Sequence, residues 1–176
     1  MHSIHLRRVH IHLYKAPVQP AIRASFGLIT ERSLLLIAVE DREGYMGWGE
    51  VWTGFPPIGA RYRAELLERL VAPLILDASF SGPTKIHEHL LESLLPVVRM
   101  AAESGPVFQS LAGLDCALWD LVARRAGKPL YQILGGKDSC AAIPVYASGI
   151  PPHIDETGLD GIRKQGFRAF KLKAGF

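Results

Sequence analysis

Two lysines near the end of the sequence, Lys171 and Lys173, have the type and spacing that could remove a proton from carbon. The segment 167–174 is predicted to be a strand, and residues two apart in a strand share one face. Phe170 and Leu172 then lie on the other, apolar face. If that face packs beneath helices, both ammonium groups point into the interior that the sheet encloses. Desolvation and mutual repulsion each favour the neutral amine, which can act as a general base.

A second interpretation of this segment is an amphipathic edge strand whose two lysines are solvated and deter aggregation. Taken alone, the lysine pattern favours that interpretation. Its place at the end of a second parallel strand favours catalysis, because barrel enzymes carry their catalytic groups at the carboxyl ends of such strands. The residues alone leave both interpretations open.

Two patterns in the first part of the sequence could also carry chemistry. Glu50 follows two strand glycines, Gly47 and Gly49, which would let another backbone or a ligand approach closely. We interpret Glu50 as a hydrogen-bonded residue at a strand end rather than as a catalytic carboxylate. His10 and His12 share a strand face, but no third ligand follows at a sensible spacing, so a polar sheet face is favoured over a zinc site.

Asp115 and Asp120 form a possible carboxylate pair in a helical segment. Residues five apart on a helix do not lie one above the other. A capping role or a hydrogen bond between helices is therefore the simpler explanation for both.

The elements that must position these residues begin with strands. Three strands are predicted, at 4–14, 33–40 and 45–52, and the short turn between the last two makes them an antiparallel hairpin. The apolar alternation changes phase at Arg7-Arg8, which indicates a bulge there. Together these strands predict a three-stranded antiparallel sheet.

A loop and three helices complete this first part. Residues 15–31 show no clear period and predict a long loop, and long ordered loops tend to be functional. Helical apolar spacing then covers 62–76, a second helix opens at Pro83, and a third runs from Pro106 to a glycine cap at Gly127. Strands followed by helices predict an α+β domain.

The character of the sequence changes near residue 140. A strand at 143–148, a helix at 155–165 and a strand at 167–174 form a βαβ unit with parallel pairing. One such unit exposes its strand edges and one face, so further polypeptide or docking on the first domain must complete it. We therefore predict two domains, 1–139 and 140–176, of which the second is incomplete.

The composition argues against several classes of protein. The formal net charge is only +3 and no dense run of Lys and Arg occurs, so we expect no nucleic-acid partner. Two cysteines, Cys116 and Cys140, are too sparse for a disulfide framework and indicate a reducing compartment. We see no charged leader followed by an apolar stretch and no apolar run of about 18 residues. We expect a cytoplasmic protein without a membrane partner.

Five segments in order along the chain resemble motifs of the mandelate racemase / muconate lactonizing enzyme family of the enolase superfamily. The resemblance is to its glycine-rich strand, its A-x-x-x-D-x-A-L-W-D-L helix, its G-K-P-L connector and its first two barrel strands. These segments are 47–50, 112–121, 127–136, 143–148 and 166–175. The resemblance implies an α+β N-terminal capping domain followed by the first β/α units of a TIM-like barrel.

The same resemblance implies an enzyme that abstracts the α-proton of a small carboxylate substrate and gives an enediolate held by Mg²⁺. By this resemblance Lys173 is the base, and Lys171 contacts the substrate carboxylate and assists. Specificity is expected from the loops at 17–31 and 52–58, in which Phe26, Trp52 and Phe55 are candidate wall residues.

In this family the Mg²⁺ carboxylates and the second base come from later barrel strands, so we assign no metal ligand within this sequence. The resemblance therefore does not distinguish racemase, cycloisomerase and acid-sugar dehydratase. We expect the 176-residue chain to be inactive alone and the full enzyme to be a homo-oligomer. The alternative is a truncated cap that acts as an interaction or oligomerisation module.

Overall fold

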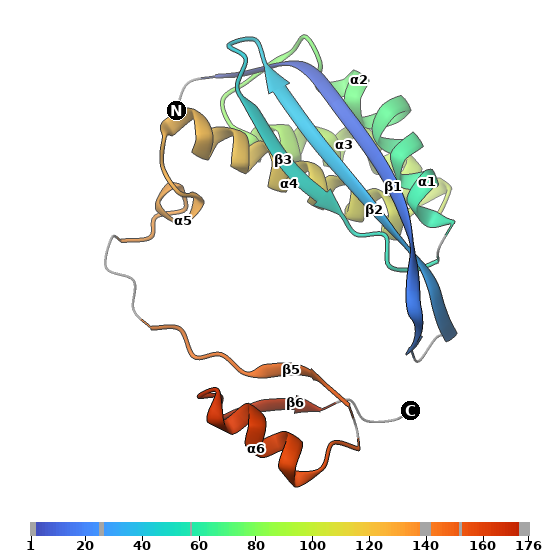
Figure 1. Ribbon diagram of the computed structural model, residues 1–176. Helices are drawn as coiled ribbons and strands as arrows, with labels where there is room; N and C mark the ends of the chain where they lie inside the picture. Colours follow the sequence, from blue (N-terminus) through green and yellow to red (C-terminus); the bar gives the residue numbers. More distant parts are fainter. Residues whose placement is uncertain (1–2, 25–26, 57, 138–141, 152, 173–176) are drawn as a thin grey trace. The chain divides into compact units, whose positions relative to one another are not determined.

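The computed structural model describes residues 3–24, 27–56, 58–137, 142–151 and 153–172. The chain divides into two compact units. Unit 1 contains Met1–Ile22 and Ile29–Gly136, and unit 2 contains Arg23–Leu28 and Lys137–Phe176. Figure 1 shows the elements of both units coloured along the sequence.

A four-stranded antiparallel sheet organises unit 1, where the sequence predicted three strands. Its order is β3-β2-β1-β4, and the strands are β1 (Ile4–Ala24), β2 (Gly27–Asp41), β3 (Met46–Val51) and β4 (Ser79–Phe80). The predicted hairpin is confirmed, with Leu35 of β2 opposite Val51 of β3. The additional strand β4 pairs antiparallel with the start of β1, where His5 lies opposite Ser79. Two residues are too few to show an alternation, which explains why the sequence did not indicate it.

The loop predicted at 15–31 is wrong, because strand structure continues through most of it. β1 runs on to Ala24 and β2 begins at Gly27. Between Tyr14 and Arg32 no described residue is buried. Neither face of this two-stranded extension packs on a core, so its sequence shows no apolar alternation. One cross-strand ion pair lies in it, with 2.8 Å between Lys15 Nζ and Glu31 Oε1.

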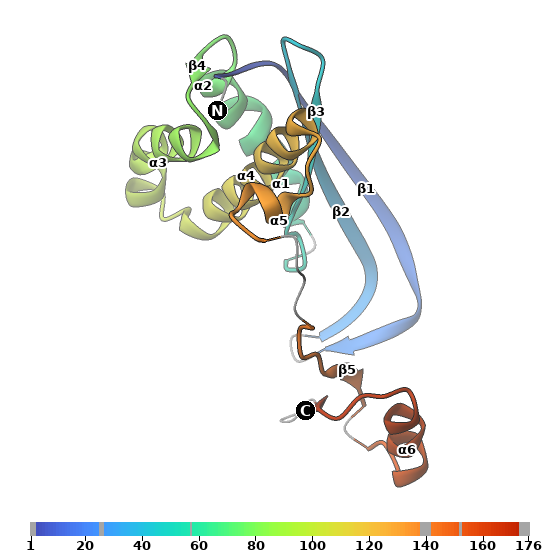
Figure 2. The same ribbon diagram turned by 90° about the vertical axis from the view of Figure 1, so that its left-hand side faces the viewer.

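The helices of unit 1 cover one face of the sheet, as the turned view in Figure 2 shows. They are α1 (Gly59–Leu66), the π-helical turn η1 (Leu67–Val71), α2 (Ala72–Ile75), α3 (Pro83–Met100), α4 (Ser104–Ala126) and α5 (Leu130–Ile133). The predicted end of the third helix is confirmed, because Gly127 caps α4 with a left-handed φ of 61°. Within the described ranges, no helix combines the length and apolar character that crossing a bilayer requires.

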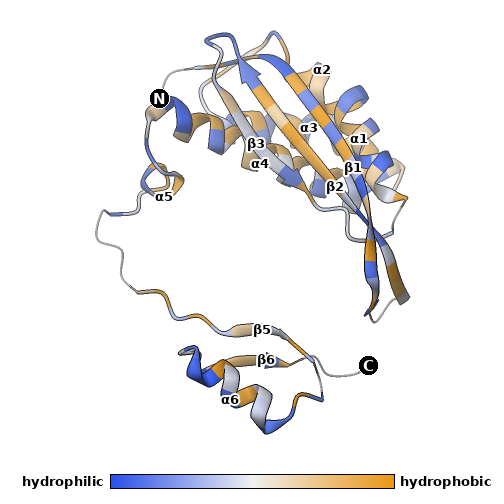
Figure 3. Ribbon diagram, in the orientation of Figure 1, coloured by the Kyte–Doolittle hydropathy of each residue, from blue (hydrophilic) through white to orange (hydrophobic). Residues whose placement is uncertain are grey.

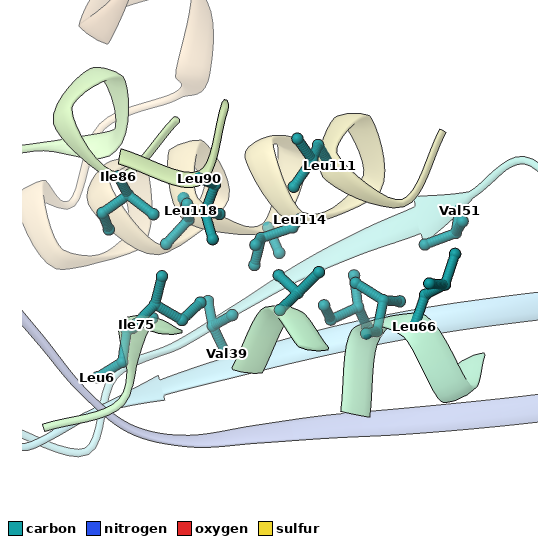
Figure 4. Packing of buried hydrophobic residues seen from close by; sticks show 14 of the residues in the cluster. Leu6, Val39, Val51, Leu66, Ile75, Ile86, Leu90, Leu111, Leu114 and Leu118 are labelled. Carbon is teal, nitrogen blue, oxygen red and sulfur yellow. The ribbon is translucent and has the colours of Figure 1, made fainter. Parts of the chain in front are cut away.

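The hydrophobic core lies between these helices and the sheet. Figure 4 shows Val39 and Val51 of the sheet facing Leu114 and other leucines of the helices. The apolar run of β2 appears in orange in Figure 3, where the strand passes beside the helices. On β1, Ile4 and Leu6 are buried, and the partly buried core contacts then shift to the odd positions from residue 9 onward. This phase change at Arg7-Arg8 agrees with the prediction.

Close backbone contact between β3 and α4 explains the glycines of the G-x-G pattern. A Cβ built on Gly49 would lie 2.1 Å from the carbonyl oxygen of Gly113, and one on Gly47 would lie 2.1 Å from that of Ala117. Real Cβ atoms do not approach oxygen so closely, so only glycine lets the strand and the helix meet here. The approaching group is thus another backbone, which is one of the two explanations that the sequence allowed.

Asp120 on α4 stabilises the contact between β3 and α4 by hydrogen bonds. Its Oδ2 accepts from the backbone N–H of Trp48 at 2.8 Å and from Nε of Arg124 at 2.7 Å. Asp120 therefore has a structural hydrogen-bonding role, but its partners lie on strand β3 and on its own helix rather than on another helix. Asp115 lies on the same helix and makes no hydrogen bond or ion pair with the described residues, so its suggested role stays a prediction.

We expect Asp120→Ala to lower the free energy of unfolding by about 1–2 kcal/mol, because the Trp48 amide loses its acceptor. Urea denaturation followed by circular dichroism measures this change. Asp115→Ala is the matched control and should stay within about 0.5 kcal/mol of wild type. Equal losses in the two variants would contradict the assignment.

Candidate functional site

One candidate region is the strand–helix–strand arrangement of unit 2. β5 (Ala147–Ile150) pairs in parallel with β6 (Phe170–Leu172), and α6 (Glu156–Lys164) connects them. The Asp155 side chain caps α6 by accepting from the N–H of Gly158 at 2.8 Å. The predicted parallel pairing is confirmed. β5 begins four residues later than the predicted strand, because pairing with β6 starts only where Ala147 lies opposite Phe170.

Lys171 lies on the face of β6 that points away from α6. The guanidinium carbon of Arg163, on α6, lies 5.9 Å from the ring centroid of Phe170, so Phe170 faces the helix. Strand alternation places Lys171 on the opposite face. The residue is solvent-exposed in unit 2. Lys173, the predicted base, lies outside the described residues, so the geometry of the lysine pair stays a prediction.

Tyr146 is a neighbour of Lys171 that the sequence did not single out. The Lys171 Nζ lies 5.6 Å from the centre of the Tyr146 ring, within the range of a cation–π contact. Such a contact holds the ammonium group beside the start of β5 and orients it. Strand alternation could have indicated Tyr146, because it shares a face with Ser148, opposite to that of Ala147.

A separate candidate region is the loop between β3 and α1 in unit 1. Its described residues are 52–56 and 58, and Trp52 and Phe55 expose 53% and 46% of their surface. Their role as wall residues stays a prediction. The buried Thr53 anchors the loop by donating its hydroxyl hydrogen to the carbonyl of Ser33 at 3.0 Å. Phe26, the other predicted wall residue, lies outside the described residues.

Arg63, on the first turns of α1, is a buried cation beside this loop. Only 3% of it is exposed, and burial lowers the pKa of its guanidinium while the nearby charge of Glu103 partly opposes that change. Burial and the nearby carboxylate of Glu103 raise the pKa of the Tyr62 phenol. No sequence pattern indicates Arg63, because its side-chain partner Gln109 lies 46 residues further along the chain.

The other candidate groups lie on the sheet face that the helices leave free. His10 stacks on His12, and His12 stacks in turn on Tyr14 and Trp48. His10 Nε2 lies 3.5 Å from a carboxylate oxygen of Glu40. Nowhere in the described ranges do three His, Cys, Asp or Glu side chains gather as metal ligands would. The described residues therefore do not fit a magnesium site, and we assign none of them to the metal.

Unit 1 is an antiparallel sheet covered by helices on one face, and a parallel strand–helix–strand unit follows it along the chain. This order of elements is typical of one class of protein. Unit 1 has the fold of an enolase superfamily N-terminal capping domain. The model of the mandelate racemase / muconate lactonizing enzyme N-terminal domain matches residues 6–135. The chain belongs to the mandelate racemase / muconate lactonizing enzyme family.

Known proteins resemble the chain over nearly all of its length. The 3,6-anhydro-alpha-L-galactonate cycloisomerase of Streptomyces coelicolor is 30% identical over 97% of this chain and 46% of its own. A mandelate racemase/muconate lactonizing enzyme structure from Bordetella bronchiseptica is 42% identical, with a TM-score of 0.81 over 99% of this chain and 45% of that one. The chain thus spans about half the length of the relatives it matches.

A third comparison shows bound molecules. A Bradyrhizobium enolase crystallised with magnesium and mandelic acid is 25% identical, with a TM-score of 0.77 over 99% of this chain and 46% of that one. This neighbour binds both a metal ion and a small carboxylate. These are the two components that the resemblance implied for the whole enzyme.

Proposed function

We propose that this chain supplies the cap and the first lysine pair of an enzyme that removes the α-proton of a carboxylate substrate. The observation that carries the proposal is the position of Lys171 on the face of β6 away from α6. Lys173 follows two residues later and shares that face if the strand continues. In a barrel whose helices lie outside, this is the face that lines the interior.

The two lysines have different roles in the proposed reaction. The neutral amine of Lys173 takes the proton from the α-carbon, and the electron pair of the broken C–H bond moves into the carboxylate to form an enediolate. Lys171 remains an ammonium group and contacts the substrate carboxylate, with its side chain oriented by the ring of Tyr146. Trp52 and Phe55 contribute apolar wall to the substrate pocket.

Mg²⁺ is the cofactor that we propose for the whole enzyme, supported by the neighbour that binds magnesium and mandelic acid. The named relatives support a racemase or a cycloisomerase, and the acid-sugar dehydratase stays a prediction. Because these relatives are enzymes, we favour catalysis over an interaction or oligomerisation module. The homo-oligomer stays a prediction.

The experiment that tests the proposal is proton exchange in the whole protein that contains this chain. Aromatic 2-hydroxy acids, sugar acids and anhydro-sugar acids are incubated with the protein in D₂O, and the α-proton is followed by ¹H NMR. We expect loss of the α-proton signal for at least one of these carboxylates with Mg²⁺, and no loss after the metal is removed with EDTA. Exchange that is unaffected by EDTA, or no exchange with any of these acids, would contradict the proposal.

A further inference from the structure

The buried guanidinium of Arg63 is held by three neutral groups from separate parts of unit 1. Its Nε donates to Oε1 of Gln109 at 2.8 Å, and its Nη2 donates to the same oxygen. Its Nη1 donates to the carbonyl of Gly59 at 2.8 Å. Its Cζ lies 5.9 Å from the ring centroid of Trp52. Arg63 therefore connects helix α4, the start of α1 and the β3–α1 loop.

Arg63 is a buried cation whose hydrogen-bond partners are neutral, and the charge that acts on it from nearby is that of Glu103. Removing a charge from water is costly, and apolar residues of similar volume often replace buried ionic groups without loss of stability. The planar fork of arginine, which lysine lacks, serves two acceptors and an aromatic face at once. Beyond packing, this arrangement fixes the orientation of Gln109, the Gly59 carbonyl and the Trp52 ring relative to one another.

The glycines around Arg63 show that the close contacts depend on small residues. A Cβ built on Gly59 would lie 2.3 Å from Arg63 Nη1, in the space that the guanidinium fills. A Cβ built on Gly54 would lie 2.9 Å from Cζ2 of Trp52, so the indole ring packs directly on the loop backbone. The Trp52 ring is thus held against Gly54 and beside Arg63, although 53% of the residue remains exposed.

We propose that Arg63 is a positioning residue that fixes the Trp52 ring as a wall of the substrate pocket and thereby sets substrate affinity. This inference rests on the proposed function, because the pocket is that of the proposed enzyme. Arg63 itself acts through Trp52 and takes no part in proton transfer. Its removal should therefore weaken substrate binding much more than it slows the chemical step.

The test compares Arg63→Met with Arg61→Met in the whole protein that contains this chain. Arg61 lies on the same helix, but its side chain is 80% exposed and its Nε donates to Glu65 on the helix surface, so it is a matched control. Hydrogen exchange of the amides at 52–55 reports the loop, and steady-state kinetics separate KM from kcat. We expect Arg63→Met to speed loop exchange and to raise KM, each by about tenfold, with kcat within about twofold of wild type.

Two further variants test the geometry rather than the charge. Arg63→Lys keeps the charge but loses the fork, so it should behave like Arg63→Met. Gln109→Glu keeps an acceptor for the fork and should behave like wild type. If circular dichroism shows that Arg63→Met does not fold, Gln109→Leu takes its place, because it removes the acceptor that Nε and Nη2 share. Hydrogen exchange of the loop and steady-state kinetics of that variant then test whether Arg63 positions Trp52.

The outcomes distinguish this inference from the proposed function. Loop exchange in Arg63→Met equal to that in Arg61→Met would overturn the inference, whatever the activity. A fall in kcat with unchanged KM would also overturn it, because that pattern belongs to a catalytic group. If the wild-type protein exchanges no α-proton, the proposed function fails, while loop exchange still decides whether Arg63 fixes Trp52.

Discussion

Lys173→Met should lower the rate of α-proton exchange from one face of the substrate by about 10²–10⁴-fold, which is the usual contribution of a general base. Methionine has nearly the length of lysine but cannot accept a proton. The change is measured by ¹H NMR in D₂O on the whole protein that contains this chain, with circular dichroism to confirm that the variant folds.

Lys171→Met is the matched variant on the same strand face. Because we propose that Lys171 contacts the substrate carboxylate, its loss should raise KM as well as slow exchange. Unchanged exchange in Lys173→Met would remove that residue as the base. Exchange lost in Lys171→Met but retained in Lys173→Met would reverse the two assignments.

Gly49→Ala should strongly destabilise the domain, because the added methyl group meets the backbone of α4. The new methyl would lie 2.1 Å from the Gly113 carbonyl oxygen and 2.9 Å from the Ala117 nitrogen, which are both backbone atoms of α4. Neither can rotate away, so the strand and the helix must separate along their contact. We expect a loss of about 3 kcal/mol or more, at the upper end of overpacking costs and a large part of a domain's typical stability.

Gly105→Ala makes the same chemical change on α4 at a position where no atom lies within 4 Å of the built Cβ. There alanine should stabilise the helix by up to about 1 kcal/mol. Urea denaturation of both variants measures the two changes. A Gly49→Ala variant as stable as wild type would show that the junction between β3 and α4 can widen without cost.

The parts of the fold that the sequence predicted are those with a strong local pattern. The β2–β3 hairpin follows from an apolar run, a short turn with Gly44 and a second apolar segment, and each of these is contiguous. The end of α4 follows from Gly127 alone, because a left-handed residue at a helix end favours glycine. Local patterns of this kind need no knowledge of the partner element.

The parts that it did not predict depend on residues distant in the sequence. β4 has two residues and exists only because the start of β1 lies beside it. The cluster around Arg63 joins positions 52, 59 and 109, which no periodicity connects. In the candidate site the face of Lys171 could be predicted from alternation, whereas its contact with Tyr146 depends on the register of two strands.

The extension of β1 and β2 beyond the helices has a consequence for how such a protein can diversify. No described side chain between Tyr14 and Arg32 is buried, so substitutions there place little demand on the core. Residues inserted in matched pairs on both strands would lengthen the extension and preserve the register elsewhere. A lineage could therefore vary the length and composition of this segment over many generations while the rest of the cap keeps the same interior.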